Sequence, residues 1–383
     1  MAVAQSPPMG PGDIALRALT PSQIAFLERL PKAELHAHLN GSIPIPVLLE
    51  LAREHTHTHA PSPPPANASA NANANAEPLA AEILLAVERL RAGVEVASIH
   101  EIFPLFSAVY ALTSTPASLR RATRGVLSHF LDPASEASPS AAEEGGGAAA
   151  AAAYLELRTT PRETPHMSRR VYLETVLDEI EARSPDAAAL IVSLDRRMTA
   201  DVAREVLELA VQLRREGRRV VGVDLCGDVK ACDVTVFVKL FRIARAEGLG
   251  VTLHAAETKE NSVETRELLS CEPERLGHAT FLDEEERKVV LERGTCIEIC
   301  LTSNLLCKTV LQLEDHHIRY YLAQNHPIAI STDDILPFRN SILGEYALLM
   351  APKPFGLGLT ESEIERVARM GMESRFPNPS SLP

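Results

Sequence analysis

Histidine and carboxylate side chains recur in this sequence at the ends of short apolar runs. His36 and His38 lie two residues apart in ELHAHL, and His254 follows GVTL. Asp333 and Asp334 come directly after PIAIST. Imidazole nitrogen and carboxylate oxygen are ligands that zinc binds well. Three histidines and one aspartate have the composition of a catalytic zinc site that keeps one position for water.

Each of these residues also fits a plain structural role. His254 alone fits a core histidine bonded to the backbone, and the aspartate pair fits the N-cap of a following helix. Glu257, three residues after His254, fits a solvated loop charge. Their joint placement favours a site, because each lies at the same end of a predicted strand.

A hydrolytic reaction at such a site needs proton donors and acceptors beside the metal. Zinc lowers the pKa of its water from about 15.7 to about 7, so hydroxide is available at neutral pH. Glu257 follows ligand His254 closely and is the candidate proton donor. His278 in RLGHA is the candidate that hydrogen-bonds the hydroxide and holds charge in the transition state.

The elements that must position these residues alternate between strand and helix patterns, as in β/α units of a parallel sheet. Strands are predicted at 34–39, 154–158, 188–195, 220–226, 250–256, 275–279, 296–302 and 327–332, and helices at 171–182, 200–215 and 234–248. Eight strands predict a closed (β/α)8 TIM-type barrel, whose catalytic groups lie where strands end. Alternation along the first strand points His36 and His38 to the same face.

Two low-complexity segments interrupt the barrel pattern. Residues 55–78 and 133–153 are rich in Ala, Pro, Ser, Asn or Gly and poor in large apolar residues. Such segments cannot bury enough surface to offset their ordering entropy, so we predict insertions that loop out of a single domain at 13–383. Residues 1–12 are predicted to be a disordered tail. His55, His57 and His59 fall in the first insertion and are not taken as a metal site.

Composition and charge exclude several classes of protein. The chain has 383 residues, 45% apolar and 23% charged, which excludes a mostly disordered protein. Its net charge of −13 argues against a nonspecific nucleic-acid binder. No run is long and apolar enough to cross a membrane, and no signal peptide is evident. The six cysteines form no C-x-x-C pair, so we expect a cytoplasmic protein with reduced thiols, and a monomer.

Seven motifs, in order over about residues 28–350, resemble the adenosine and AMP deaminase superfamily. The resemblance is greatest to its adenosine-deaminase-like members that act on N(6)-methyl-AMP. The motifs are LPKAELHAHLNGS (30–42), YLELRTTPR (154–162), VGVDLCGD (221–228), HAAE (254–257), ERLGHATFL (274–282), CLTSN (300–304) and STDD (331–334). The H-x-E and P-C-x-x-C signature of the cytidine-deaminase type is absent.

The resemblance implies a role for each matching residue. It implies that Glu257 protonates purine N-1 and that His278 orients the hydroxide attacking carbon 6. Asp334 is similar to the carboxylate that hydrogen-bonds N-7, and the Gly227 N–H to the donor for N-3. One zinc ion per chain is implied to be held by His36, His38, His254 and Asp333.

The choice between nucleoside and nucleotide depends on the group that meets the 5′ position. Enzymes for free adenosine carry Asp where this chain has Asn40. A carboxylate about 4 Å from a phosphate costs roughly 1–4 kcal/mol per charge pair, whereas an amide can donate to it. Arginine also matches phosphate by forked hydrogen bonds. We expect the segment after the second strand to bind phosphate: Thr159, Thr160, Pro161 and Arg162. The alternative is that this segment is only a polar turn with a surface arginine.

The same resemblance implies that His38, Tyr110 and Asp195 contact substrate. Tyr110 stands where relatives more often have His, and it fits equally an apolar helix stripe with Phe106. The arginines at 196 and 197 have nearby acids as alternative partners and are not included in the predicted site.

The predicted function is zinc-dependent hydrolysis at the purine 6-position, with N(6)-methyl-AMP and water giving IMP and methylamine. The first alternative is deamination of free adenosine. The second, of another class, is a catalytically silent barrel that acts as a binding protein. The chain ends in SRFPNPSSLP where members of the superfamily continue into another helix, so we expect a shortened C-terminus and a partly uncovered barrel.

Overall fold

The structure is a computed structural model. It describes residues 9–58, 76–92, 101, 103–133, 150–231, 234–260 and 262–378. The side chains of 56–58, 76–80 and 103 are not described.

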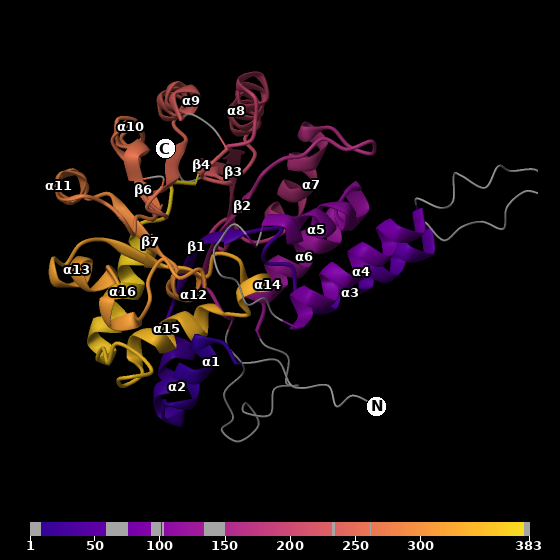
Figure 1. The fold of residues 1–383 in the computed structure, drawn as a ribbon. Coiled ribbons are helices and arrows are strands. Elements are labelled where there is room, and N and C mark those ends of the chain that lie inside the picture. Colours follow the sequence, from indigo (N-terminus) through magenta and orange to yellow (C-terminus); the bar gives the residue numbers. More distant parts are fainter. Residues whose placement is uncertain are drawn as a thin grey trace, which may run out of the picture.

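Eight parallel strands form a nearly closed barrel, as predicted (Figure 1). They are β1 (Ala33–His38), β2 (Tyr154–Thr159), β3 (Ala188–Asp195), β4 (Val220–Cys226), β5 (Gly250–Ala255), β6 (Arg275–His278), β7 (Cys296–Ile299) and β8 (Ile328–Ile330). Each strand pairs with the next along the chain. The Asp333 N–H donates to His36 O at 2.8 Å, which joins the end of β8 to β1 and closes the ring.

Helices surround the barrel and also extend it (Figure 1). The first group comprises α1 (Pro11–Arg17), α2 (Pro21–Arg29), α3 (Ile45–Thr58), α4 (Ala76–Ala92), α5 (Phe106–Leu112) and α6 (Pro116–Leu131). The second comprises α7 (Arg169–Glu181), α8 (Ala200–Arg215), α9 (Thr235–Ala246), α10 (Thr265–Leu269) and α11 (Glu284–Arg293). The third comprises α12 (Leu301–Leu306), α13 (Ile318–Ala323), α14 (Ile335–Phe338), α15 (Ile342–Met350) and α16 (Glu361–Glu373).

Most predicted elements agree with the structure within two residues at each end, and β3, β4 and α8 agree at both ends. The strand predicted at 296–302 is wrong at its end, because α12 begins at Leu301. The buried carboxylate of Glu345 accepts the Thr302 N–H at 3.2 and 3.3 Å. The first N–H groups of a helix lack internal partners, so this carboxylate stabilises a helix start where the apolar run alone predicts more strand.

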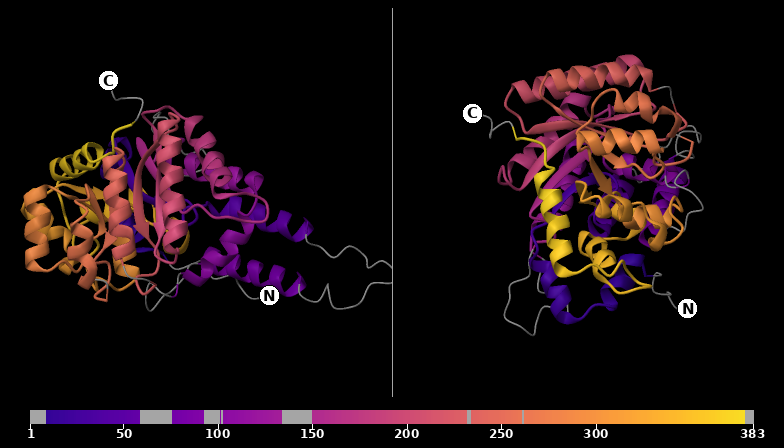
Figure 2. Two further views of the ribbon diagram at one scale, coloured as in Figure 1. Left: turned by 90° about the horizontal axis from the view of Figure 1, so that it is seen from above. Right: turned by 90° about the vertical axis from the view of Figure 1, so that its left-hand side faces the viewer.

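The low-complexity segments meet ordered structure at their ends. α3 continues to Thr58 and α4 begins at Ala76, so both ends of the 55–78 segment are helical. The two helices lie side by side and project from the barrel (Figures 1 and 2). Ala153 donates to Lys32 O at 2.8 Å, which ties the end of the 133–153 segment to β1. Residues 59–75 and 134–149 lie outside the described residues, while 11 and 12 of the expected tail belong to α1.

The C-terminal segment packs against one side and the amino end of the barrel. α16 lies along the outside of β8 and β1 (Figure 2). Beyond it, the Phe376 ring occupies the amino end of the barrel against the backbones of Gly222 and Gly250, where an added Cβ would lie 2.7 and 2.3 Å from the ring. Phe376 N donates to the buried Glu156 carboxylate at 2.7 Å. None of the described helices is both long and apolar enough to cross a membrane.

Candidate active site

A pocket opens at the carboxyl ends of the strands, where the fold predicts catalytic groups. Most of the predicted site residues line it: His38, Asn40, Tyr110, Thr159, Thr160, Asp195, Gly227, His254, Glu257, His278, Asp333 and Asp334. His36 is fully buried beside its floor. Pro161 and Arg162 do not line this pocket.

Four of these residues form a tight cluster. His38 Nε2 lies 3.3 Å from His254 Nε2 and 3.5 Å from Asp333 Oδ1. His36 Nε2 lies 3.7 Å from the same Asp333 oxygen. Two ligands of a tetrahedral zinc ion, each about 2.0–2.1 Å from it, lie about 3.3 Å apart. The spacing of the four side chains therefore suits a single ion.

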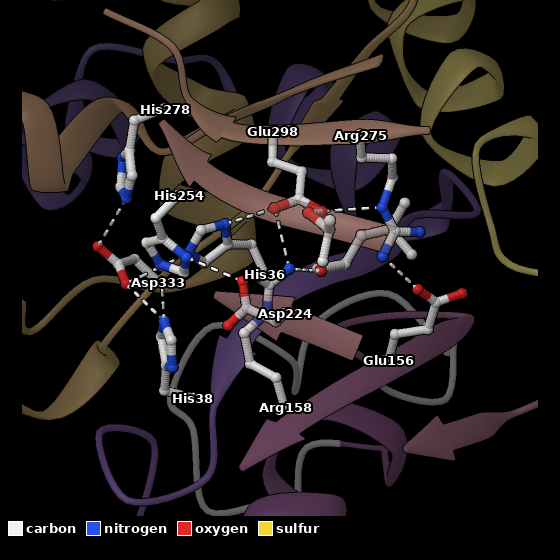
Figure 3. Close-up of polar contacts among 12 residues, drawn as sticks. His36, His38, Glu156, Arg158, Asp224, His254, Arg275, His278, Glu298 and Asp333 are labelled. Atoms are coloured by element: carbon white, nitrogen blue, oxygen red, sulfur yellow. Dashed lines mark hydrogen bonds and ion pairs between the residues drawn. The ribbon is translucent and has the colours of Figure 1, made fainter. Parts of the chain in front are cut away.

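Hydrogen bonds to the far side of two imidazoles determine which nitrogen is free to bind a metal (Figure 3). His36 Nδ1 donates to Glu298 Oε2 at 2.6 Å, and His254 Nδ1 donates to Asp224 Oδ1 at 2.9 Å. With the proton on Nδ1, each Nε2 carries its lone pair into the cluster. His36 Nε2 is buried and has no hydrogen-bond partner among the described residues. An unpaired buried acceptor is costly, and a metal ion would satisfy it.

Burial keeps the imidazoles of His36 and His38 in the neutral form that a metal requires. Burial lowers the pKa of His36 and His38 well below the usual value, and the positive charge of Arg158 adds to the effect. Burial acts to lower the pKa of His254 as well, but the charge and hydrogen bond of Asp224, together with the charge of Glu257, outweigh burial and raise this pKa. That opposite shift reflects the carboxylate at its Nδ1, the same contact that turns Nε2 toward the cluster.

Asp224 and Glu298 are site residues that the sequence analysis missed. Both are fully buried in strands, and both contact Arg158: Glu298 Oε2 at 2.9 Å and Asp224 Oδ1 at 3.4 Å. Burial acts to raise the pKa of either carboxyl, but neighbouring positive charges, with Arg158 among them, lower both pKa values below the usual range. Acidic residues inside the apolar runs VGVDLC and CIEIC were the available signal, since buried acids are rarely unpaired.

Glu257 and His278 lie on the open side of the cluster. His278 Nε2 is 3.5 Å from Glu257 Oε1 and 3.9 Å from Asp333 Oδ2. Burial lowers the pKa of His278 to about 4, and neither ring nitrogen has a hydrogen-bond partner among the described residues. The backbone of His278 has φ 62°, a left-handed conformation that costs energy in a non-glycine residue. His317 Nε2 donates to its carbonyl at 2.8 Å and helps to hold it there.

The end of β8 adds a second carboxylate. The carboxylate of Asp333 accepts a hydrogen bond from Ser303 Oγ at 2.7 Å. Asp334 Oδ1 is buried with no hydrogen-bond partner among the described residues, and burial followed by the charge of Asp333 raises its pKa well above the usual value. Gly41 leaves room for this side chain, since a Cβ there would lie 1.6 Å from Asp334 Oδ1. Asn40, the neighbour of this glycine, has an amide oxygen that is also buried and unpartnered.

The segment expected to bind phosphate is only partly turned toward the pocket. Thr159 and Thr160 line it. The Arg162 guanidinium donates to Tyr110 O at 3.1 Å and to Thr113 Oγ1 at 2.8 Å, and it stacks 4.3 Å from the Tyr110 ring. These contacts hold Arg162 behind Tyr110 rather than in the pocket.

The two arginines left out of the predicted site have different environments. Arg196 is buried and pairs with Glu264 at 2.6 Å, as expected of an arginine with a nearby acid. Arg197 pairs with Asp195, through Nε at 2.8 Å and a terminal nitrogen at 2.5 Å. Its side chain nevertheless lines the pocket and is 51% exposed, so one face of the guanidinium is open to a ligand.

Comparisons with known proteins agree with this geometry. Residues 145–381 match the family described as adenosine deaminase. An adenosine deaminase-like protein of Drosophila melanogaster is 33% identical over 337 residues, 87% of this chain and 88% of that protein. The crystal structure of N6-mAMP deaminase from Arabidopsis has a TM-score of 0.75 at 30% identity and covers 92% of this chain and 95% of its own. A structure described as the ADAL–IMP complex has the same TM-score and identity, with coverage of 92% and 94%.

Proposed function

Because this chain belongs to the adenosine deaminase family, we propose that it hydrolyses N(6)-methyl-AMP to IMP and methylamine. The observation that carries the proposal is the cluster of His36, His38, His254 and Asp333 beside Glu257 and His278, with all but the buried His36 lining one pocket. The relatives from Arabidopsis thaliana and Homo sapiens, at 30% and 29% identity, are described as N6-methyl-AMP deaminases. A silent binding protein would have no need of imidazole nitrogens such as His36 Nε2 and His278 Nε2, which are buried without a hydrogen-bond partner among the described residues.

The metal proposed for the site is one zinc ion. Neutral imidazole nitrogens with one carboxylate suit zinc, and the cluster leaves its open side for water. Bound there, zinc supplies a water molecule activated for attack on an electrophilic carbon. The four proposed ligands are His36, His38, His254 and Asp333.

The remaining polar groups provide for the purine. Glu257 delivers a proton to N-1, which makes carbon 6 more electrophilic, and His278 hydrogen-bonds the attacking water. The protonated carboxyl of Asp334 donates to N-7, which its raised pKa supports. The Gly227 N–H donates to N-3. This glycine has φ 99°, and a Cβ there would lie 2.8 Å from Asp195 Oδ1, so a larger residue would disturb the pocket wall.

The 5′-phosphate is proposed to lie between Asn40, Thr159, Thr160 and Arg197. Asn40 places a neutral amide where a carboxylate would repel a phosphate. Among the described lining residues the arginines are Arg158 and Arg197. Arg158 is fully buried against two carboxylates, whereas Arg197 is half-exposed. This arrangement favours a nucleotide over free adenosine.

The compartment and oligomeric state are also proposals. Five described cysteines are buried free thiols. Free thiols suit a reducing compartment, so the protein is proposed to act in the cytoplasm. It is proposed to act as a monomer.

An assay of the zinc-loaded protein on N(6)-methyl-AMP, AMP and adenosine, side by side, tests the proposal. We expect the highest kcat/KM with N(6)-methyl-AMP and release of one methylamine per IMP formed. A preference for adenosine would retain the deaminase chemistry and refute the phosphate site. No turnover of any of the three by folded, zinc-loaded protein would refute the proposed function.

A further inference from the structure

Arg158 stands between the two carboxylates that contact metal-facing histidines (Figure 3). One of its terminal nitrogens lies 2.9 Å from Glu298 Oε2, and the other lies 3.4 Å from Asp224 Oδ1. The same two oxygens accept the Nδ1 protons of His36 and His254, at 2.6 and 2.9 Å. The five side chains therefore form one continuous path from one imidazole to the other.

The path is built from strands that are far apart in the sequence. Arg158 lies on β2, Asp224 on β4 and Glu298 on β7, and all three side chains are fully buried. A planar guanidinium can contact two carboxylates at once with fixed geometry, which an ammonium group cannot do. The guanidinium therefore fixes the orientations of the two carboxylates relative to each other.

The positive charge of Arg158 also stabilises the two buried carboxylates. Without it, Asp224 and Glu298 would be two buried negative charges with one fewer cation near them. Buried charges that lose a partner rearrange or admit water, because desolvation is no longer compensated. Either response would move the acceptors of the His36 and His254 Nδ1 protons, and with them the two Nε2 atoms.

We propose that Arg158 is a positioning residue for the metal centre, holding Glu298 and Asp224 so that His36 and His254 present Nε2 to the ion. The proposal rests on the metal centre of the proposed function. It assigns Arg158 no contact with metal or substrate, because its effect passes through the two carboxylates. It predicts that substitution of Arg158 weakens metal binding by more than the accompanying loss of folding stability explains.

Arg275 offers a matched control. It is also buried and also bridges two carboxylates, with Nε 2.8 Å from Glu298 Oε1 and a terminal nitrogen 2.6 Å from Glu156 Oε2. Its contacts lie on the side of Glu298 away from His36, toward Phe376 at the amino end of the barrel. Arg275 pairs with Glu298 through the oxygen that His36 does not use, so Arg275→Lys should disturb the same buried network with a much smaller effect on the metal-facing imidazoles.

The experiment compares wild type, Arg158→Lys and Arg275→Lys. The zinc dissociation constant is measured by competition with a chromogenic chelator, and the urea midpoint of each metal-free protein is measured separately. We expect Arg158→Lys to weaken zinc binding about 10–100-fold, in the range seen for groups that orient metal ligands. For Arg275→Lys we expect a lower urea midpoint and a zinc dissociation constant within about threefold of wild type.

The absorption spectrum of the Co²⁺-loaded protein gives a readout that a purely structural role would not change. Because the visible bands of Co²⁺ depend on ligand geometry, we expect them to shift in Arg158→Lys and to remain unchanged in Arg275→Lys. Equal zinc affinity in Arg158→Lys and wild type would overturn the proposal. Equal weakening by both substitutions, in proportion to lost stability, would overturn it as well.

The variant could fail to fold, and the wild type could fail to bind zinc; each result is distinguishable from unchanged zinc affinity. If Arg158→Lys does not fold, the Arg158→Gln/Asp224→Asn double variant replaces it, because this variant removes one positive and one negative charge together. We then expect weaker zinc binding than in Asp224→Asn alone, and equal binding would overturn the proposal. If the wild type binds no zinc, the proposed function fails together with this proposal, a result distinct from unchanged affinity in the variant.

Discussion

The Phe376 ring lies with its centroid 3.7 Å from the guanidinium carbon of Arg275, at the amino end of the barrel. Phe376 is 5% exposed, and its ring leaves no room for a side chain at Gly222 or Gly250. A C-terminal segment thus completes the packing beneath a buried ion-pair network whose other end reaches the proposed metal ligands His36 and His254.

Replacement of this ring should destabilise the whole barrel. Phe376→Ala removes a buried aromatic side chain and its contact with Arg275, so we expect a loss of about 3–5 kcal/mol in the free energy of unfolding. Urea denaturation of the metal-free protein measures it. Phe376→Leu, which keeps most of the apolar volume, should lose less. A change below about 1 kcal/mol in Phe376→Ala would contradict this packing role.

Glu257 should affect turnover without affecting the metal. Glu257→Gln keeps the size of the side chain and removes the proton that it delivers. We expect kcat on N(6)-methyl-AMP to fall by about 10²–10⁴-fold, the usual contribution of a general acid. Zinc content and the thermal midpoint should match wild type. Activity within about threefold of wild type would show that another group protonates the purine.

Arg197 and Arg162 can be distinguished by their effect on the nucleotide. Arg197→Met should lower kcat/KM for N(6)-methyl-AMP about tenfold or more, because a hydrogen bond between charged groups is lost, and should affect adenosine less. Arg162→Met should have a smaller effect on this ratio, because its guanidinium is bound behind Tyr110. A larger effect from Arg162→Met would mean that Arg162 leaves Tyr110 and binds the phosphate.

Glu345 should make stability depend on pH away from the active site. Burial raises its pKa to about 7, partly offset by hydrogen bonds from Thr302 and Asn340. The folded state therefore holds the proton more tightly than the unfolded state. This contribution to stability is fully present below the unfolded pKa near 4.5 and is lost as the pH rises through about 7.

Glu345→Gln tests this dependence, because the amide oxygen can still accept from Thr302 but does not titrate. Between pH 4.5 and 8 we expect the variant to gain stability relative to wild type by an amount on the order of 3 kcal/mol. Urea titrations at several pH values measure the difference between the two free energies of unfolding. A difference that stays constant with pH would show that Glu345 ionises normally.

The sequence was sufficient to predict the barrel and the position of its pocket. Apolar runs that alternate with amphipathic stretches predict parallel strands. For β3, β4 and α8 both predicted boundaries were correct. His36 and His38 were expected to share a face, and their rings lie 5.2 Å apart. The alternation of side chains along a strand and the position of residues at strand ends are local features of the sequence. The shared face and the pocket can therefore be predicted without knowing which strands are neighbours.

Tertiary structure alone decided which buried charges meet. Arg158, Asp224 and Glu298 lie on three strands that are not neighbours in the barrel, and no local spacing relates them. The partner of a buried charge is determined by barrel closure and strand register, which here join residues 66 and 140 positions apart in the sequence. The same holds at the mouth, where Arg162 is held by α5 while Arg197, paired with Asp195, faces the pocket. The sequence determined which side chains can do chemistry, and the closed sheet determined which of them do it together.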